Sequence, residues 1–138
     1  MADPLSISAS VVALLQLSDS VVRYISEVKD ARQERLKITA EISGTSVLVR
    51  MLGERIEEEE SNPAWLPTIK SLGLPNGPFE QFKQTLQYIE SKMAPSKGLA
   101  KVGKALAWPF KKDEIGKLLN TLERLKSLFH LALENDHV

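Results

Sequence analysis

Apolar residues recur every three or four positions along most of this chain of 138 residues. That spacing places the apolar residues of a segment on one face of an α-helix, and no stretch has the strict alternation of a β-strand. The sequence therefore predicts an all-α fold. With 43% hydrophobic and 26% charged residues, the composition is that of a soluble globular protein, and the length predicts one domain over residues 1–138.

The first two helices are expected over residues 4–30 and 32–59, with Pro4 in the first position of the first helix. In the second helix, Gly44 and Gly53 each cost about 1 kcal/mol relative to alanine, which predicts a kink or a close helix contact. The expected buried rows are Ile7, Val11, Leu14, Ser18, Val21, Ile25 and Val28 in the first helix, and Ile38, Ile42, Thr45, Val49, Leu52 and Ile56 in the second.

Residues 61–78 are rich in proline and glycine and predict a connection with at most a short turn. A third helix should begin at Pro78 and stop at Pro95, and a last helix should run from Asp113, as its N-cap, to about Asn135. Four long helices with apolar stripes are typical of an up-and-down bundle. The stripes expected here are Phe79, Phe82, Leu86, Ile89 and Met93, then Ile115, Leu118, Leu119, Leu122, Leu125, Phe129, Ala132 and Leu133.

A lysine-rich segment precedes the last helix, with six lysines and no acidic residue from Lys92 to Lys112. Its apolar residues share one sector of a helical projection, so we expect an additional short amphipathic helix before the last one. This segment is either a bundle helix with solvated lysines or a contact with a membrane surface or an acidic partner. The apolar residues are Leu99, Val102, Leu106 and Phe110, and the lysines expected at a membrane surface are Lys97, Lys101, Lys104, Lys111 and Lys112.

The start of the chain is unusual because Pro4 to Ser18 holds 15 uncharged residues. As a helix this segment would span ~22 Å, which is too short for a hydrocarbon core of ~30 Å. A signal peptide is not favoured either, since the first basic residue is Arg23, and we expect an intracellular protein that is soluble at rest. The segment is either a permanently buried helix or one that is buried at rest and released into lipid.

The composition argues against an enzyme and implies no cofactor or metal. The chain has no cysteine, two histidines and a formal net charge of zero, so neither a thiolate site nor an overall attraction to nucleic acid is expected. No phosphate-binding glycine loop occurs. His130 and Glu134 share a helix face, but a solvent-exposed pair is favoured over an acid–base site. Residues 57–60 are four glutamates, interpreted as a solvated helix end.

Two stretches resemble a known family: MADPLSISASVVALLQL at the start and ALAWPFKKDEIGKLLNTLERLKSLFHLALENDH near the end. Together they are similar to the N-terminal, HeLo-like domain of fungal STAND proteins, which are NOD-like receptors with NACHT and repeat domains. The resemblance implies a helical bundle akin to the killer domain of the mixed-lineage kinase domain-like protein. It also implies an effector of programmed cell death and innate immunity that oligomerises and permeabilises membranes.

The same resemblance implies the partners and the location. They would be anionic membrane lipid, other copies of the domain, and downstream NACHT and repeat domains in a longer native chain. The protein would be cytoplasmic at rest and reach the plasma membrane on activation. The alternative is a helical module that oligomerises or docks a partner without a membrane step. In the membrane interpretation, the inserting residues would be Leu5, Ile7, Val11, Val12, Leu14 and Leu15.

Overall fold

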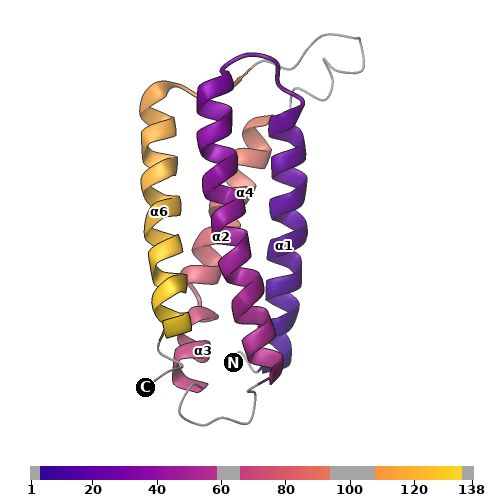
Figure 1. Cartoon of the computed structure of the whole chain (residues 1–138), viewed down its shortest axis with the longest axis vertical. Coiled ribbons are helices and arrows are strands. Elements are labelled where there is room, and N and C mark those ends of the chain that lie inside the picture. The colour runs from indigo at the N-terminus through magenta and orange to yellow at the C-terminus, as the bar shows by residue number, and fades with distance from the viewer. Residues whose placement is uncertain (1–3, 59–65, 94–107, 135–138) are drawn as a thin grey trace.

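The structure is a computed structural model that describes residues 4–58, 66–93 and 108–134. Within these ranges every regular element is an α-helix, so the prediction of an all-α fold is confirmed there. The helices, shown in Figure 1, are α1 (Pro4–Ser26), α2 (Arg32–Glu58), α3 (Leu66–Leu72), α4 (Pro78–Met93) and α6 (Lys112–Glu134).

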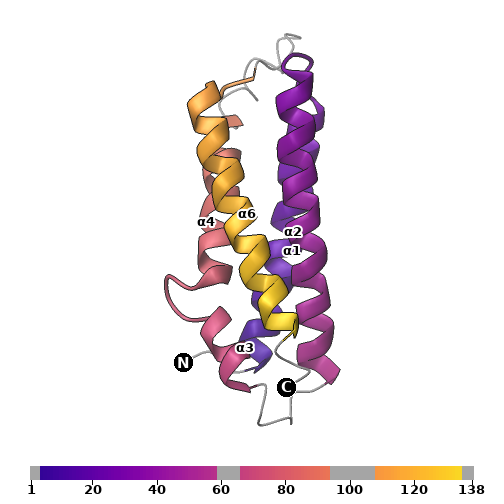
Figure 2. The same cartoon turned by 60° about the vertical axis from the view of Figure 1, so that its left-hand side comes forward.

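Helices α1, α2, α4 and α6 lie side by side and form a helical bundle (Figures 1 and 2). Each of α1 and α6 contacts both α2 and α4, so the four helices surround one core. Along the chain, each of these four helices runs in the opposite direction to the one before it (Figure 1). We call the end where α1 finishes and α6 begins the upper end, and the end where α2 and α6 finish the lower end.

The buried side chains of the bundle are those that the apolar spacing predicts. Every expected row residue of α1, α2 and α4 is buried. In α6 the expected face is also buried, except that Leu119 and Leu133 are only partly so. Phe129 of α6 packs between two rings of α4, with ring centroids 5.5 Å from Phe79 and 6.1 Å from Phe82. This aromatic contact joins α4 to α6 across the core.

Helix α1 ends at Ser26, earlier than the expected residue 30. The next two amides close tight turns instead, since the N–H groups of Glu27 and Val28 each donate to a carbonyl three residues earlier at 3.2 Å. Ala31 then has a positive φ of 54°, which reverses the chain into α2. Val28 remains buried although it lies beyond the helix.

The start of α6 also differs from the prediction, because Asp113 is not its N-cap. The helix begins at Lys112, and the N–H of Ile115 donates to the carbonyl oxygen of Lys111 at 3.0 Å. The N–H of Lys111 in turn donates to Oε1 of Glu114 at 3.2 Å. This is the carboxylate half of a capping box, so Lys111 occupies the cap position and Asp113 lies in the first turn.

Two expectations for the connections change as well. The connection after α2 contains α3, a helix of 7 residues, where only a short turn was expected. Pro67 lies in its first turn, where a missing N–H costs nothing. Most of the expected amphipathic helix lies outside the described residues, but residues 108–111 are not helical. Phe110 is buried beside Tyr88 and so does not extend an amphipathic face.

Candidate functional site

Helix α1 directs most of its predicted inserting residues into the core. Ile7, Val11 and Leu14 are buried, and Leu15 is partly buried against the core. Val12 lies on the opposite face and is 54% exposed. The predicted inserting residues are therefore divided between the two faces, with an apolar side facing α2 and α4 and one large apolar side chain facing solvent.

None of the helices in the described ranges has the length and hydropathy needed to cross a membrane. Leu5 belongs to α1, but its side chain lies outside the described residues.

A glycine lets α1 approach α2 closely. A Cβ atom built on Gly53 would lie 2.8 Å from Cγ1 of Val11, which is closer than side chains tolerate. At Gly44, by contrast, a Cβ atom would meet Cδ of Lys126 at an ordinary 3.7 Å. The close helix contact expected from the glycines is thus confirmed at Gly53. There α2 packs directly against Val11 of α1.

The hydroxyl side chains that occupy the apolar rows of α1 and α2 make hydrogen bonds within their own helices. In α1, Oγ of Ser18 donates to the carbonyl oxygen of Leu14 at 2.8 Å. In α2, Oγ1 of Thr45 donates to the carbonyl oxygen of Glu41 at 2.7 Å. Both hydroxyls fill positions of the apolar rows without leaving a buried donor unpaired.

Trp108 connects the segment before α6 to the start of α2 at the upper end. Its indole Nε1 donates to Oε2 of Glu34 at 2.9 Å, and its backbone N–H donates to Oδ1 of Asp30 at 3.1 Å. Its ring packs edge-on against Phe110, with centroids 5.0 Å apart. Trp108 thus packs at the upper end of the bundle, and the two carboxylates are partners that the sequence did not reveal.

A second polar network at the upper end joins α4 to α6. The hydroxyl of Tyr88 donates to Oε2 of Glu114 at 2.6 Å, and Nζ of Lys92 lies 3.3 Å from the same oxygen. The hydrogen bonds from Tyr88 and from the N–H of Lys111, with Lys92 nearby, lower the pKa of Glu114 to about 2. The bond to Glu114 also raises the pKa of both Tyr88 and Lys92. Glu114 is thus held in its charged form.

Of the predicted membrane-surface lysines, Lys111 and Lys112 are exposed at the upper end. Both belong to the start of α6 rather than to the expected amphipathic helix. Lys97, Lys101 and Lys104 lie outside the described residues.

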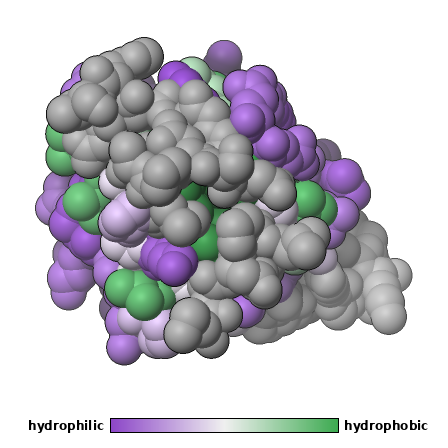
Figure 3. All heavy atoms as spheres, turned by 90° about the horizontal axis from the view of Figure 1, so that it is seen from below, coloured by the Kyte–Doolittle hydropathy of each residue, from purple (hydrophilic) through white to green (hydrophobic). Residues whose placement is uncertain are grey.

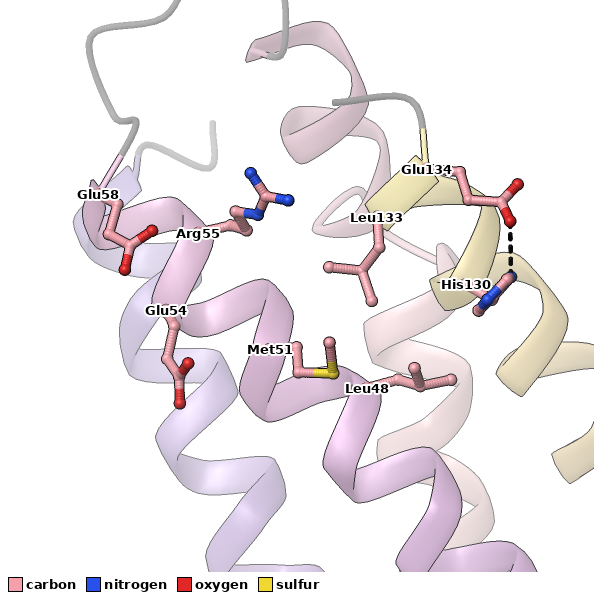
Figure 4. Close-up of a pocket in the computed structure, with 8 residues that line it drawn as sticks. All are labelled: Leu48, Met51, Glu54, Arg55, Glu58, His130, Leu133 and Glu134. Atoms are coloured by element: carbon pink, nitrogen blue, oxygen red, sulfur yellow. Dashed lines mark ion pairs between the residues drawn. The ribbon is translucent and has the colours of Figure 1, made fainter. Parts of the chain in front are cut away.

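A groove runs between α2 and α6 toward the lower end, and Figure 4 shows its side chains. One hollow of about 270 Å³ has an apolar wall of Leu48, Met51 and Leu133. A second hollow of about 500 Å³ adjoins it and shares Leu48 and His130. The signal for this groove was present in the sequence as apolar residues outside the predicted buried stripe of α2, at Leu48 and Met51.

The polar rim of the groove contains the predicted exposed pair. Nδ1 of His130 lies 3.4 Å from Oε1 of Glu134, and both side chains are exposed. Across the part of the chain that the structure describes, no three His, Cys, Asp or Glu side chains gather as a metal site would require. The groove is lined by apolar and charged side chains.

Comparison of the chain with protein-family models, with curated proteins and with solved structures gives no match.

Proposed function

We propose that this chain is the N-terminal effector domain of a fungal NOD-like (STAND) receptor. It would induce cell death by membrane targeting and permeabilisation through its first helix. The complete domain would be an up-and-down bundle of four long helices with a short amphipathic helix before the last. It would act without a cofactor and would not be an enzyme.

One observation carries this proposal: α1 is uncharged from Pro4 to Ser18, and it keeps its apolar row inside the bundle. Exposing Ile7, Val11 and Leu14 to water would cost roughly 5–9 kcal/mol, at about 1.5–3 kcal/mol for each buried aliphatic side chain. That cost would keep α1 in the bundle of an isolated copy. Transfer of the same side chains into lipid removes the cost, because hydrocarbon replaces the core as their surroundings.

Lysines at the upper end would hold the domain against an anionic membrane. Each lysine near such a surface contributes about 1 kcal/mol, so the five predicted lysines together contribute about as much as the lower estimate for exposing α1. Lys111 and Lys112 lie exposed at this end, and the other three precede them in the sequence. Clustering of several copies would multiply this attraction and would favour release of α1 at the membrane.

Dye release from vesicles tests the proposal. Protein clustered through a fused dimeriser is expected to release dye from vesicles with anionic lipid and to release less from neutral vesicles. Val12→Glu should abolish release without unfolding the domain, because Val12 is 54% exposed. The matched control is Val47→Glu on α2, where the side chain is 48% exposed and no insertion is proposed. Intact anionic vesicles in the presence of clustered, folded protein would exclude the membrane mechanism.

The second candidate function is a module that oligomerises or docks a partner with no membrane step. The apolar side chains exposed at the α2/α6 groove support it, since Met51 and Leu131 are each about half exposed. Sedimentation with and without liposomes separates the two functions. A stable oligomer that forms without lipid and does not pellet with liposomes favours this second function.

A further inference from the structure

The α2/α6 groove combines an apolar wall with a mainly acidic rim. Leu48 and Met51 of α2 face Leu133 of α6 across the hollow in Figure 4. Arg55 and His130 also line it, and His130 is paired with Glu134. The carboxylates that line the same hollow are Glu54, Glu58 and Glu134.

Although the net charge of the chain is zero, acidic and basic side chains are unevenly distributed between the two ends of the bundle. The lower end carries the groove carboxylates and the exposed Glu57 beside them. Viewed from below, hydrophobic surface there lies among hydrophilic surface (Figure 3). The upper end carries the exposed Lys111 and Lys112, while Lys92 there is paired with Glu114. Two copies can therefore attract each other when the upper end of one meets the lower end of the other.

The part of the sequence between α4 and α6 has the chemistry that the groove would bind. Between Lys92 and Lys112 the sequence has six lysines and no acid, with Leu99, Val102 and Leu106 at helical spacing. A basic amphipathic helix suits a groove with an apolar wall and a carboxylate rim, because each face of the helix meets its complement.

This segment cannot reach the groove of its own copy. Residues 94–107 are 14 residues joined to α4 and α6 at the upper end. From Lys112 to His130, α6 extends 18 residues along its helix, or about 27 Å. A helix over 97–106 would leave three residues, 94–96, at one end and one residue, 107, at the other. At about 3.5 Å per residue these cannot bridge that distance.

We propose that the α2/α6 groove binds the lysine-rich segment 97–107 of a second copy of this chain. This contact rests on the proposed function, because it would provide the surface for the self-association that the function includes. It does not depend on a membrane step, so it can fail while the vesicle assay succeeds, and the reverse also holds. Two copies in antiparallel orientation would make the contact twice, once with each groove.

Paired charge reversals on the full chain test the contact. Sedimentation velocity over a series of concentrations should show reversible association of the natural sequence that weakens as salt rises. Glu54→Lys with Glu58→Lys in the groove should weaken association at least about tenfold, and so should Lys101→Glu with Lys104→Glu in the segment. Asp19→Lys on α1 and Lys83→Glu on α4 are the matched controls, since both side chains are exposed away from the groove and both changes should leave association intact.

Mixing the two double variants gives the sharpest result. Each variant alone places like charges across the contact, whereas a mixed pair has a basic segment facing an acidic groove and an acidic segment facing a basic groove. Fluorescence-detected sedimentation with one variant labelled should therefore show association restored in the mixture. Circular dichroism confirms that each variant retains its helices.

Three outcomes would overturn the inference. The first is a protein that stays monomeric at every accessible concentration. The second is association whose strength is unchanged in both double charge-reversal variants. The third is association that responds to Trp65→Ala but not to the lysine changes, because the groove would then be filled by the connection that follows α2. Restoration in the mixture with both controls unchanged would support the second copy as the occupant.

Discussion

Replacement of Gly53 by alanine tests the contact that places α1 against α2. In an open helix position, Gly→Ala stabilises a protein by about 1 kcal/mol through helix propensity alone. At Gly53 the new methyl group would lie 2.8 Å from Cγ1 of Val11. Valine has few side-chain rotamers, so it cannot turn away freely, and overpacking of this kind costs about 1–3 kcal/mol. The net change should range from neutral to about 2 kcal/mol destabilising.

Gly116 is the matched control because it also lies within a helix, and a Cβ atom there would meet nothing within 4 Å. Gly116→Ala should stabilise by about 1 kcal/mol, so the two substitutions should differ by about 1–3 kcal/mol. For a chain of this size, 1 kcal/mol corresponds to roughly 3–5 °C in Tm. Urea unfolding followed by circular dichroism gives the free energies, and differential scanning calorimetry gives the Tm values.

A double-mutant cycle isolates the contact itself. Val11→Ala removes both γ-methyl groups and should cost about 2 kcal/mol, but in that background Gly53→Ala should become stabilising because the new methyl group enters the vacated space. If Gly53→Ala stabilises the natural sequence as much as Gly116→Ala does, α1 and α2 do not approach as described. Equal effects of Gly53→Ala in the two backgrounds would refute the contact in the same way.

Three further predictions follow from the polar networks and the core. The lowered pKa of Glu114, about 2, means that its stabilising effect is complete above the ordinary carboxyl pKa and is lost as pH falls toward 2. Tyr88→Phe should raise that pKa, measured by NMR titration of the carboxyl carbon, and acid unfolding should begin at higher pH. Trp108→Phe removes the indole N–H bond to Glu34 and should cost about 1 kcal/mol in urea unfolding, whereas an unchanged midpoint would show that the bond contributes nothing. Phe82→Ala in the core should cost about 3–5 kcal/mol in the same assay, and a cost below 1 kcal/mol would contradict its complete burial.

The buried rows could be predicted because they depend on a local regularity. A helix repeats every 3.6 residues, so a bundle that buries one face must repeat its apolar residues at that spacing, and the positions from Ile7 to Val28 and from Ile38 to Ile56 did so. Even Ser18 and Thr45 were placed correctly, since the row continues through them.

The ends of helices were harder because several local signals compete there. Asp113 is a good N-cap by residue type, but the carboxylate of Glu114 accepts the N–H of Lys111, and the cap of α6 lies two residues earlier, at Lys111. Near Ser26 the apolar spacing continues to Val28 although the helix has ended, so periodicity alone overestimated α1.

The upper-end networks and the groove could not be predicted because they join distant parts of the sequence. Trp108 and Glu34 are 74 residues apart, and Tyr88 and Glu114 are 26 residues apart. No periodic pattern relates such pairs, and they meet only once the helices are packed. The groove depends likewise on which side of α2 faces α6, which no single helix determines.

The hydroxyl of Ser18 has a consequence for any rearrangement of the bundle. Its acceptor, the carbonyl oxygen of Leu14, belongs to the same helix, so this hydrogen bond would move with α1 as a unit. If α1 left the bundle, the Ser18 hydroxyl would keep its hydrogen bond, and no acceptor on α2 or α4 would lose its donor. Among the described side chains of α1, Ser18 is the one buried polar group, and its internal bond adds no barrier to transfer from protein to hydrocarbon, where an unpaired hydroxyl would cost several kcal/mol.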